Sequence, residues 1–432
     1  MEWLLIGITA VILYALVAGY IKYTHRWEDY VTFYGPILAL KTENVAFFDY
    51  FRRHSGFWRV YGTLGAVLVV VISVAMTVLL VLGVYNSMIN PPPPEGIYEP
   101  HNLLAIPGVN DFLPFSLAVL IGFFVTLAIH EFGHAILCRV EDIRVKSMGL
   151  LIAVIPIGAF VEPDGEAVEA ASRPSRIRMY GAGITNNIVV ALVCFAAIVV
   201  LMGMAVPSSA PLIQGVYVDY PAEQAGISPN SAIYAVNGVT VKFVSEVSDI
   251  LQTTAPGDAL AVTTLKDGVL SDYTLILEEW PEELSDNPGG FMGIQYYSPE
   301  SGKFLFNNLI KSPFGPLLLL YVPINMVMDG DSMNLGILAF DVAYADMWDV
   351  PFSGFWGIIQ ILFWTFWFNL AVGTFNALPL IPLDGGYIMQ EGVSRFFEKC
   401  NRSDLVPVVV SLISSVMIAV IILLLIIPYL LG

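Results

Sequence analysis

Long hydrophobic runs dominate the pattern of apolar and polar positions along this chain. A helix needs about 20 mostly apolar residues to cross the roughly 30 Å hydrocarbon core of a bilayer. Runs of this length occur at six places, which are 3–20, 64–84, 115–137, 181–204, 355–378 and 406–430. The pattern therefore predicts a polytopic α-helical membrane protein with about six transmembrane helices.

Three apolar runs need a decision. The run 3–20 lacks the basic start and the small-residue cleavage site of a signal peptide, so we interpret it as a retained helix. The run 147–160 contains a proline and two glycines and is short for a span, which favours a re-entrant or interfacial element. The run 313–328 contains three prolines, and we expect it at the outer membrane interface.

Composition agrees with a membrane location. Hydrophobic residues make up 56% of the 432 positions and charged residues only 13%, whereas soluble domains average about 45–50% and about 25%. This composition excludes a soluble enzyme, a disordered chain and a nucleic-acid-binding protein. The three cysteines are too few and too scattered for a disulfide framework or a cysteine-based zinc site.

Basic residues predict the orientation of the spans. Of the 19 Lys and Arg residues, 15 follow the first, third and fifth hydrophobic runs. Because such residues accumulate on the cytoplasmic side, both termini are expected outside. The chain carries a net charge of −18, and most of the acidic excess falls on the outer side, where it makes a solubilising surface.

A folded domain interrupts the hydrophobic pattern. Between 212 and 297, short β-rich runs such as GVYV, LAVTTL and YTLIL alternate with turn signals such as VNG and KDG. The stretch DYPAEQAGISPNSAIYAVNGVTV resembles the PDZ fold, and another small membrane-tethered β-domain is the alternative.

These observations divide the chain into six regions. They are two N-terminal helices with a basic cytoplasmic loop (1–114), a first part of the core (115–204), a PDZ-like extracytoplasmic domain (205–300), an outer linker (301–354), a further core helix (355–390) and a C-terminal transmembrane helix (391–432).

Candidate chemistry begins near the end of the third run, where the chain reads AIHEFGHAIL. Positions i and i+4 of a helix share one face, so His130 and His134 can hold one zinc ion. Glu131 then lies close enough to deprotonate a bound water, whose pKa zinc lowers to about 7. Ionisable groups inside a span are costly and indicate function, although a polar contact between helices is the alternative.

A catalytic zinc ion is usually bound by three protein ligands and keeps one coordination position open. Asp384, in FNALPLIPLDGG, lies at the inner end of the fifth run, on the same side of the bilayer as the two histidines. A simple turn is the alternative, because Leu-Asp-Gly-Gly is a turn-forming sequence.

The fourth run begins GAGITNNIVVAL. Gly183 permits close helix packing, and Asn187 places a neutral amide in the bundle, where it can hold substrate backbone or an oxyanion. A hydrogen bond from Asn187 to a neighbouring helix is the alternative.

Together, HExxH, Gly-x-x-x-Asn and Asn-x-x-Pro…Leu-Asp-Gly-Gly resemble the pattern of the site-2 protease family, which are intramembrane zinc metalloproteases that often carry an extracytoplasmic PDZ domain. The resemblance covers 115–390. It implies that His130, His134 and Asp384 bind one Zn²⁺ ion, that Glu131 is the general base, and that Asn187 contacts the substrate or the transition state. It also implies that 147–160 is a re-entrant β-element beside the scissile segment.

The sequence therefore predicts an endopeptidase that cuts within or near the transmembrane helix of a single-span membrane protein. Its expected surroundings are a lipid bilayer, of a prokaryotic cell or of an organelle, with the active site on the cytoplasmic side. The PDZ-like domain is expected to admit substrates after another protease has trimmed them. Release of a membrane-tethered regulator and clearance of signal-peptide remnants both remain open. A metal-binding scaffold or transporter is the alternative, against which Glu131 argues.

Overall fold

The computed structural model describes residues 2–27, 29–207, 210–266, 268–281, 284, 288–297, 299–342, 344–345 and 348–432. The chain forms two compact units. One combines Met1–Phe195 with Ile361–Gly432, and the other is Ala196–Gln360.

Within the described residues, five helices are long and apolar enough to cross a membrane. They are Ala46–Ile89, Leu117–Val140, Arg173–Met204, Phe355–Asn376 and Ser403–Leu431. Each contains most of one predicted run. The run 3–20 lies in α1 (Glu2–Thr24), of which Val11–Thr24 is a shorter apolar helix. A helical protein with several candidate spans is thus confirmed, and six spans stay a prediction.

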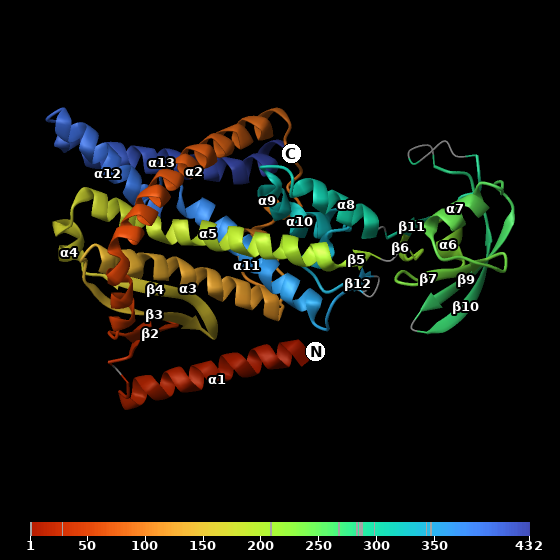
Figure 1. The fold of residues 1–432 in the computed structure, drawn as a ribbon, viewed down its shortest axis with the longest axis horizontal. Helices are drawn as coiled ribbons and strands as arrows, with labels where there is room; N and C mark the ends of the chain where they lie inside the picture. Colours follow the sequence, from red (N-terminus) through yellow and green to blue (C-terminus); the bar gives the residue numbers. More distant parts are fainter. Residues whose placement is uncertain are drawn as a thin grey trace. The chain divides into compact units, whose positions relative to one another are not determined.

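The helices that carry the chemical motifs belong to the first unit (Figure 1). Its helices are α2 (Ser55–Ile89), α3 (Leu117–Val140), α5 (Arg173–Met204), α11 (Phe355–Asn376), α12 (Asp384–Lys399) and α13 (Val406–Leu431), of which α5 and α11 continue into the second unit. Glycines allow close helix crossings in the membrane-spanning bundle. Gly133 of α3 lies against the backbone of Ala182 in α5, and Gly122 of α3 lies against Trp364 of α11. Helix α3 is therefore packed between the two other motif-bearing helices.

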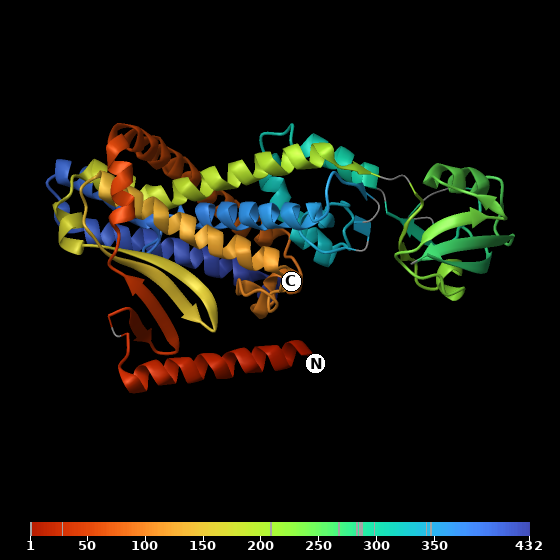
Figure 2. The ribbon, with the colours of Figure 1, turned by 60° about the horizontal axis from the view of Figure 1, so that its bottom comes forward.

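A four-stranded antiparallel sheet completes this unit, with the order β1-β2-β3-β4. Its strands are β1 (Val31–Tyr34), β2 (Ile37–Thr42), β3 (Val145–Ala153) and β4 (Ile155–Pro163). Strand β4 forms the edge that packs along α3 (Figure 2). The predicted element at 147–160 is thus a β-hairpin. The sequence analysis missed β1 and β2, because their short VTFY and ILALKT runs lie within a basic loop.

The second unit contains the predicted β-rich domain, with a sheet of order β10-β9-β7-β8 and a separate β11–β6 pair. Pro-Ala-x-x-Ala-Gly begins a helix at Pro221, and a strand ends before Asn237-Gly238, where both residues have the positive φ of a tight hairpin turn. The elements are β6 (Ile213–Val216), α6 (Pro221–Gln224), β7 (Ala232–Val236), β8 (Val239–Thr240), α7 (Val244–Leu251), β9 (Ala259–Lys266), β10 (Val269–Ile276) and β11 (Ile294–Tyr296). Buried apolar side chains from its strands, helices and loops form one core.

The predicted linker is helical in part. It contains α8 (Pro299–Leu309), α9 (Gly315–Leu318) and α10 (Val322–Met328), and its placement at the membrane interface stays a prediction. The remaining short elements are η1 (Ala46–His54), η2 (Gly96–Tyr98), η3 (Pro100–Leu103), α4 (Gly165–Ala170), β5 (Val206–Pro207), η4 (Leu319–Tyr321), η5 (Gly336–Leu338), β12 (Trp348–Asp349) and η7 (Ser403–Leu405).

Candidate active site

Three side chains from two distant segments converge at one point in the first unit. His130 and His134 project from successive turns of α3, and their Nε2 atoms are 3.2 Å apart. Oδ2 of Asp384, the first residue of α12, lies 3.2 Å from His130 Nε2 and 3.3 Å from His134 Nε2. The structure therefore brings together all three residues that the sequence predicts as metal ligands.

The separations between these atoms fit a zinc ion. Zinc binds nitrogen and oxygen ligands at about 2.0–2.2 Å in a tetrahedron, whose ligand atoms then lie about 3.3–3.5 Å from one another. The three observed separations of 3.2, 3.2 and 3.3 Å lie at or just below this edge length. Apart from the two imidazole nitrogens, Asp384 Oδ2 has no hydrogen-bond partner among the described residues. A buried carboxylate oxygen in that position is suited to a cation.

Close packing of the Leu-Asp-Gly-Gly segment fixes the position of Asp384. Helix α11 ends at Asn376, and the chain turns back so that α12 begins eight residues later. A Cβ atom on Gly385 would overlap the Ala377 backbone, and one on Gly386 would overlap the Leu380 backbone. The two glycines therefore let the first turn of α12 lie directly on the loop that precedes it.

Helix α5 supports both histidines from one face. Met179, Gly183 and Asn187 follow one another at i, i+4 and i+8, the spacing of residues that share a helix face. The Met179 carbonyl oxygen lies 2.9 Å from His134 Nδ1, and Asn187 Nδ2 lies 3.2 Å from His130 Nδ1. Between them, Gly183 has no side chain, and a Cβ there would lie 2.5 Å from His134 Nε2.

Glu131 faces the hairpin. Its Oε2 accepts a hydrogen bond of 2.7 Å from the backbone N–H of Val161 in β4. Glu131 also lines a cavity of about 340 Å³ together with the three converging residues. The cavity is also lined by residues from β4, α5, the end of α11, the loop before α12 and α12 itself, namely Val161, Pro163, Met179, Tyr180, Asn376, Pro382, Leu383 and Tyr387. The carboxylate predicted as the base is thus adjacent to both the candidate metal site and the edge strand.

Asn187 is placed differently from the other predicted site residues. Its side chain is completely buried, and it is not among the residues that line the cavity. It contacts His130 instead. A direct contact of Asn187 with substrate stays a prediction.

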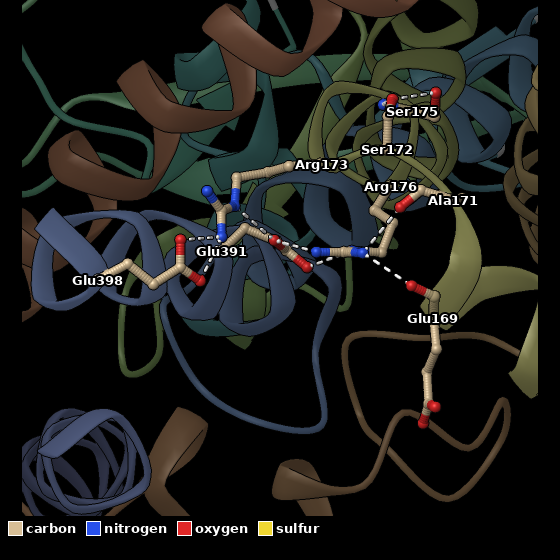
Figure 3. A network of polar contacts seen from close by, with 8 residues as sticks. All are labelled: Glu169, Ala171, Ser172, Arg173, Ser175, Arg176, Glu391 and Glu398. Atoms are coloured by element: carbon tan, nitrogen blue, oxygen red, sulfur yellow. Dashed lines mark hydrogen bonds and ion pairs between the residues drawn. The ribbon is translucent and has the colours of Figure 1, made fainter. Parts of the chain in front are cut away.

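An ion-pair network on α5 and α12 was missed by the sequence analysis (Figure 3). Arg176 forms a bidentate pair with Glu391, with distances of 2.6 and 2.9 Å, and Arg173 Nε lies 3.1 Å from the same carboxylate. Arg173 also binds Glu398 at 2.7 and 2.8 Å. We call these four residues the α5–α12 ion network. It ties the helix that begins at Asp384 to the start of α5, and the ionisable residues seven and fourteen positions after Asp384 were the available signal.

Comparison with known proteins defines the family. The sequence model of Peptidase family M50 matches residues 118–424 of this chain. This range contains nearly all of α3 and the whole of α5, α11 and α12. This chain belongs to peptidase family M50. The recognition made from the sequence is thereby confirmed, and this M50 chain is an integral membrane protein of a family of zinc metalloproteases.

Individual relatives of this M50 chain are distant. An uncharacterized protein of Methanocaldococcus jannaschii is 23% identical over 294 residues, 68% of this chain and 61% of the relative. A membrane-bound transcription factor site-2 protease homolog of Arabidopsis thaliana is 27% identical over 48% of this chain and 40% of the relative. The zinc metalloprotease RasP of Shouchella clausii is 25% identical over 50% of each chain. This M50 chain therefore spans between 40% and 61% of the lengths of these relatives.

Among solved structures, one similarity concerns a PDZ domain. The PDZ domain of the SdrC-like protein from Listeria monocytogenes is 16% identical, with a TM-score of 0.19, over 21% of this M50 chain and 90% of that domain. The name PDZ-like for the β-rich domain of this chain rests on the stretch DYPAEQAGISPNSAIYAVNGVTV.

Proposed function

We propose that this chain is an intramembrane zinc metalloendopeptidase that hydrolyses a peptide bond within or near the transmembrane helix of a membrane-anchored protein. The observation that carries the proposal is the convergence of His130, His134 and Asp384 at tetrahedral spacing, with Glu131 beside them. One Zn²⁺ ion per chain fits three ligand atoms, and it would supply the acidity that activates water and polarises the scissile carbonyl.

The chain's own residues supply the other parts of hydrolysis. Glu131 is the group placed to accept a proton from the attacking water and to return it to the leaving amine. Its hydrogen bond to Val161 holds the carboxylate between the ligands and the edge of the sheet. Strand β4 is an edge of its sheet and lines the cavity through Val161 and Pro163, so an extended substrate segment would align along it.

This arrangement sets a requirement on the substrate. The carbonyl groups of a transmembrane helix are already hydrogen-bonded within that helix, so the segment must unwind before it can be cut. Helix-destabilising Gly, Pro, Asn or Ser in the substrate should therefore favour cleavage.

The proposed topology places both termini and the PDZ-like domain outside, with the active site on the cytoplasmic side of a prokaryotic cell membrane. It rests on the distribution of Lys and Arg between the hydrophobic segments. The PDZ-like domain would exclude substrates whose outer parts have not yet been removed by another protease. Deletion of 212–297 should then permit cleavage of untrimmed substrate, and unchanged selectivity would contradict this role.

The deciding experiment uses purified full-length protein in lipid and a tagged single-span substrate whose helix contains Gly and Asn. Mass spectrometry should find a cut in or near that helix with the wild type, and none after zinc chelation. Glu131→Gln should abolish the cut but retain zinc, because the ligand set is intact. Folded wild-type protein that binds no zinc and cuts nothing would contradict the proposal and favour a membrane scaffold or transporter.

A further inference from the structure

Asn187 reaches the candidate metal site only through a histidine. Its side chain is 0% exposed, and its amide nitrogen lies 3.2 Å from Nδ1 of His130, on the side of the imidazole away from Asp384. The neighbouring turn of the same helix carries Gly183, which brings the α5 backbone close to both imidazole rings. Asn187 thus contacts His130 one turn after the glycine that lies against both imidazole rings.

The second histidine provides a comparison. His134 Nδ1 lies 2.9 Å from the carbonyl oxygen of Met179. A carbonyl oxygen only accepts hydrogen bonds, so Nδ1 of His134 must carry the proton. The lone pair of a neutral imidazole is then on Nε2, which is the atom that faces Asp384. The backbone of α5 therefore selects the tautomer of His134 that can bind a metal.

His130 needs the same tautomer, since its Nε2 is the atom that faces both other ligands. An amide N–H that donates to Nδ1 would leave the imidazole proton on Nε2, where it would point at the metal position. The amide oxygen of Asn187 is buried and has no hydrogen-bond partner among the described residues. Rotating the side-chain amide by half a turn exchanges its nitrogen and oxygen. The oxygen then lies against Nδ1 of His130 and accepts the imidazole N–H.

We propose that Asn187 is a positioning residue for zinc binding: its amide oxygen accepts the Nδ1–H of His130 and keeps Nε2 free as a ligand. The inference rests on the zinc site of the proposed function and gives Asn187 a role other than contact with substrate. Partners of this kind raise the basicity of a metal-bound histidine and fix its orientation, and their loss weakens metal binding by about 10- to 100-fold.

The test measures zinc affinity of the purified full-length protein by competition with a chelator of known strength. Asn187→Leu keeps most of the side-chain volume and removes the acceptor, so zinc should bind about 10- to 100-fold more weakly. Asn187→Asp keeps an acceptor oxygen, so its zinc affinity should stay within about threefold of the wild type or become tighter.

A neighbouring residue provides the matched control. Asn186 also contacts α3, because its Nδ2 donates to the Ile129 carbonyl at 3.2 Å, and its Oδ1 accepts from Tyr61 of α2 at 2.7 Å. It contacts the backbone beside the ligands but no imidazole nitrogen. Asn186→Leu should therefore lower the unfolding temperature and leave zinc affinity unchanged.

Two results would overturn the inference. The first is Asn187→Leu with wild-type zinc affinity; a raised KM in that variant would instead support substrate contact. The second, which decides the matter if Asn187→Leu does not fold, is a loss of more than about tenfold in zinc affinity for folded Asn187→Asp. The proposed function fails separately: a wild type that binds zinc but cuts no peptide would contradict proteolysis, while the zinc affinities of the variants would still test Asn187.

Discussion

Replacing Gly183 by alanine tests whether the α3–α5 crossing controls the metal site. The added Cβ would lie 2.5 Å from His134 Nε2 and 2.8 Å from His130 Nε2, both of them proposed ligand atoms. Ordinary contacts of a Cβ begin at about 3.4 Å, so the His134 ring must retreat by about 0.9 Å and the His130 ring, whose Cε1 would lie at 2.7 Å, by about 0.7 Å. Metal–ligand distances tolerate only about 0.2 Å. Both histidines would therefore leave their ligand positions.

The expected effects are separable. Zinc affinity should fall by at least about 100-fold, the upper end of what loss of a supporting partner costs, because two ligands move. Without zinc, the overpacked crossing should lower the free energy of unfolding by about 1–3 kcal/mol. Affinity is measured by chelator competition, and stability by thermal unfolding of protein stripped of zinc.

Gly203→Ala is the control, because it lies in the same helix and its added Cβ meets no atom within 4 Å. It should leave zinc affinity unchanged and be neutral or stabilising by up to about 1 kcal/mol, the difference in helix propensity. Wild-type zinc affinity and proteolysis in Gly183→Ala would refute the reasoning, since the helices would then have moved apart at no cost to the site.

Two further predictions concern ion pairs in the first unit. Glu391→Gln removes the central carboxylate of the α5–α12 ion network, so it should lower the free energy of unfolding by about 2 kcal/mol. It should also weaken zinc binding, because Asp384 lies on the same helix, α12. A variant with the stability and zinc affinity of the wild type would contradict this prediction. Burial acts to raise the pKa of Glu141, but hydrogen bonds from Arg178 and Ser175 outweigh it and hold that pKa below its ordinary value. A lowered pKa in the fold gives stability that is complete above the unfolded pKa of about 4.3 and is lost as the pH falls from there through the lower pKa of the folded state. Between pH 5 and pH 3, the unfolding temperature of Glu141→Gln should therefore fall less than that of the wild type, and parallel curves would contradict this.

The sequence indicated the chemistry because the HExxH motif places its chemical groups within five consecutive residues. His130 and His134 share a helix face through their spacing alone, and Glu131 follows from its place between them. The prediction of Asp384 as a ligand needed one further argument. The distribution of Lys and Arg placed its segment on the same side of the bilayer as the two histidines. Strand β1 was missed because four residues carry too little alternation to stand out within a basic loop.

The supporting contacts depend on how distant segments pack. Nothing in the order of residues shows that Met179 presents its carbonyl to His134, because every residue has a carbonyl. The contact of Asn187 with His130 likewise follows from the depth at which α5 crosses α3, which Gly183 sets.

The sequence by itself indicated the membrane helices and placed His130, Glu131 and His134 together, since these depend on composition or on spacing within one helix. Only the tertiary structure decided which side chains orient those ligands, that β4 binds Glu131 through a backbone N–H, and that Glu391 ties α12 to α5. The physical reason is range: a helix face is fixed by residues four apart, whereas a hydrogen bond across the bundle is fixed by the packing of whole helices.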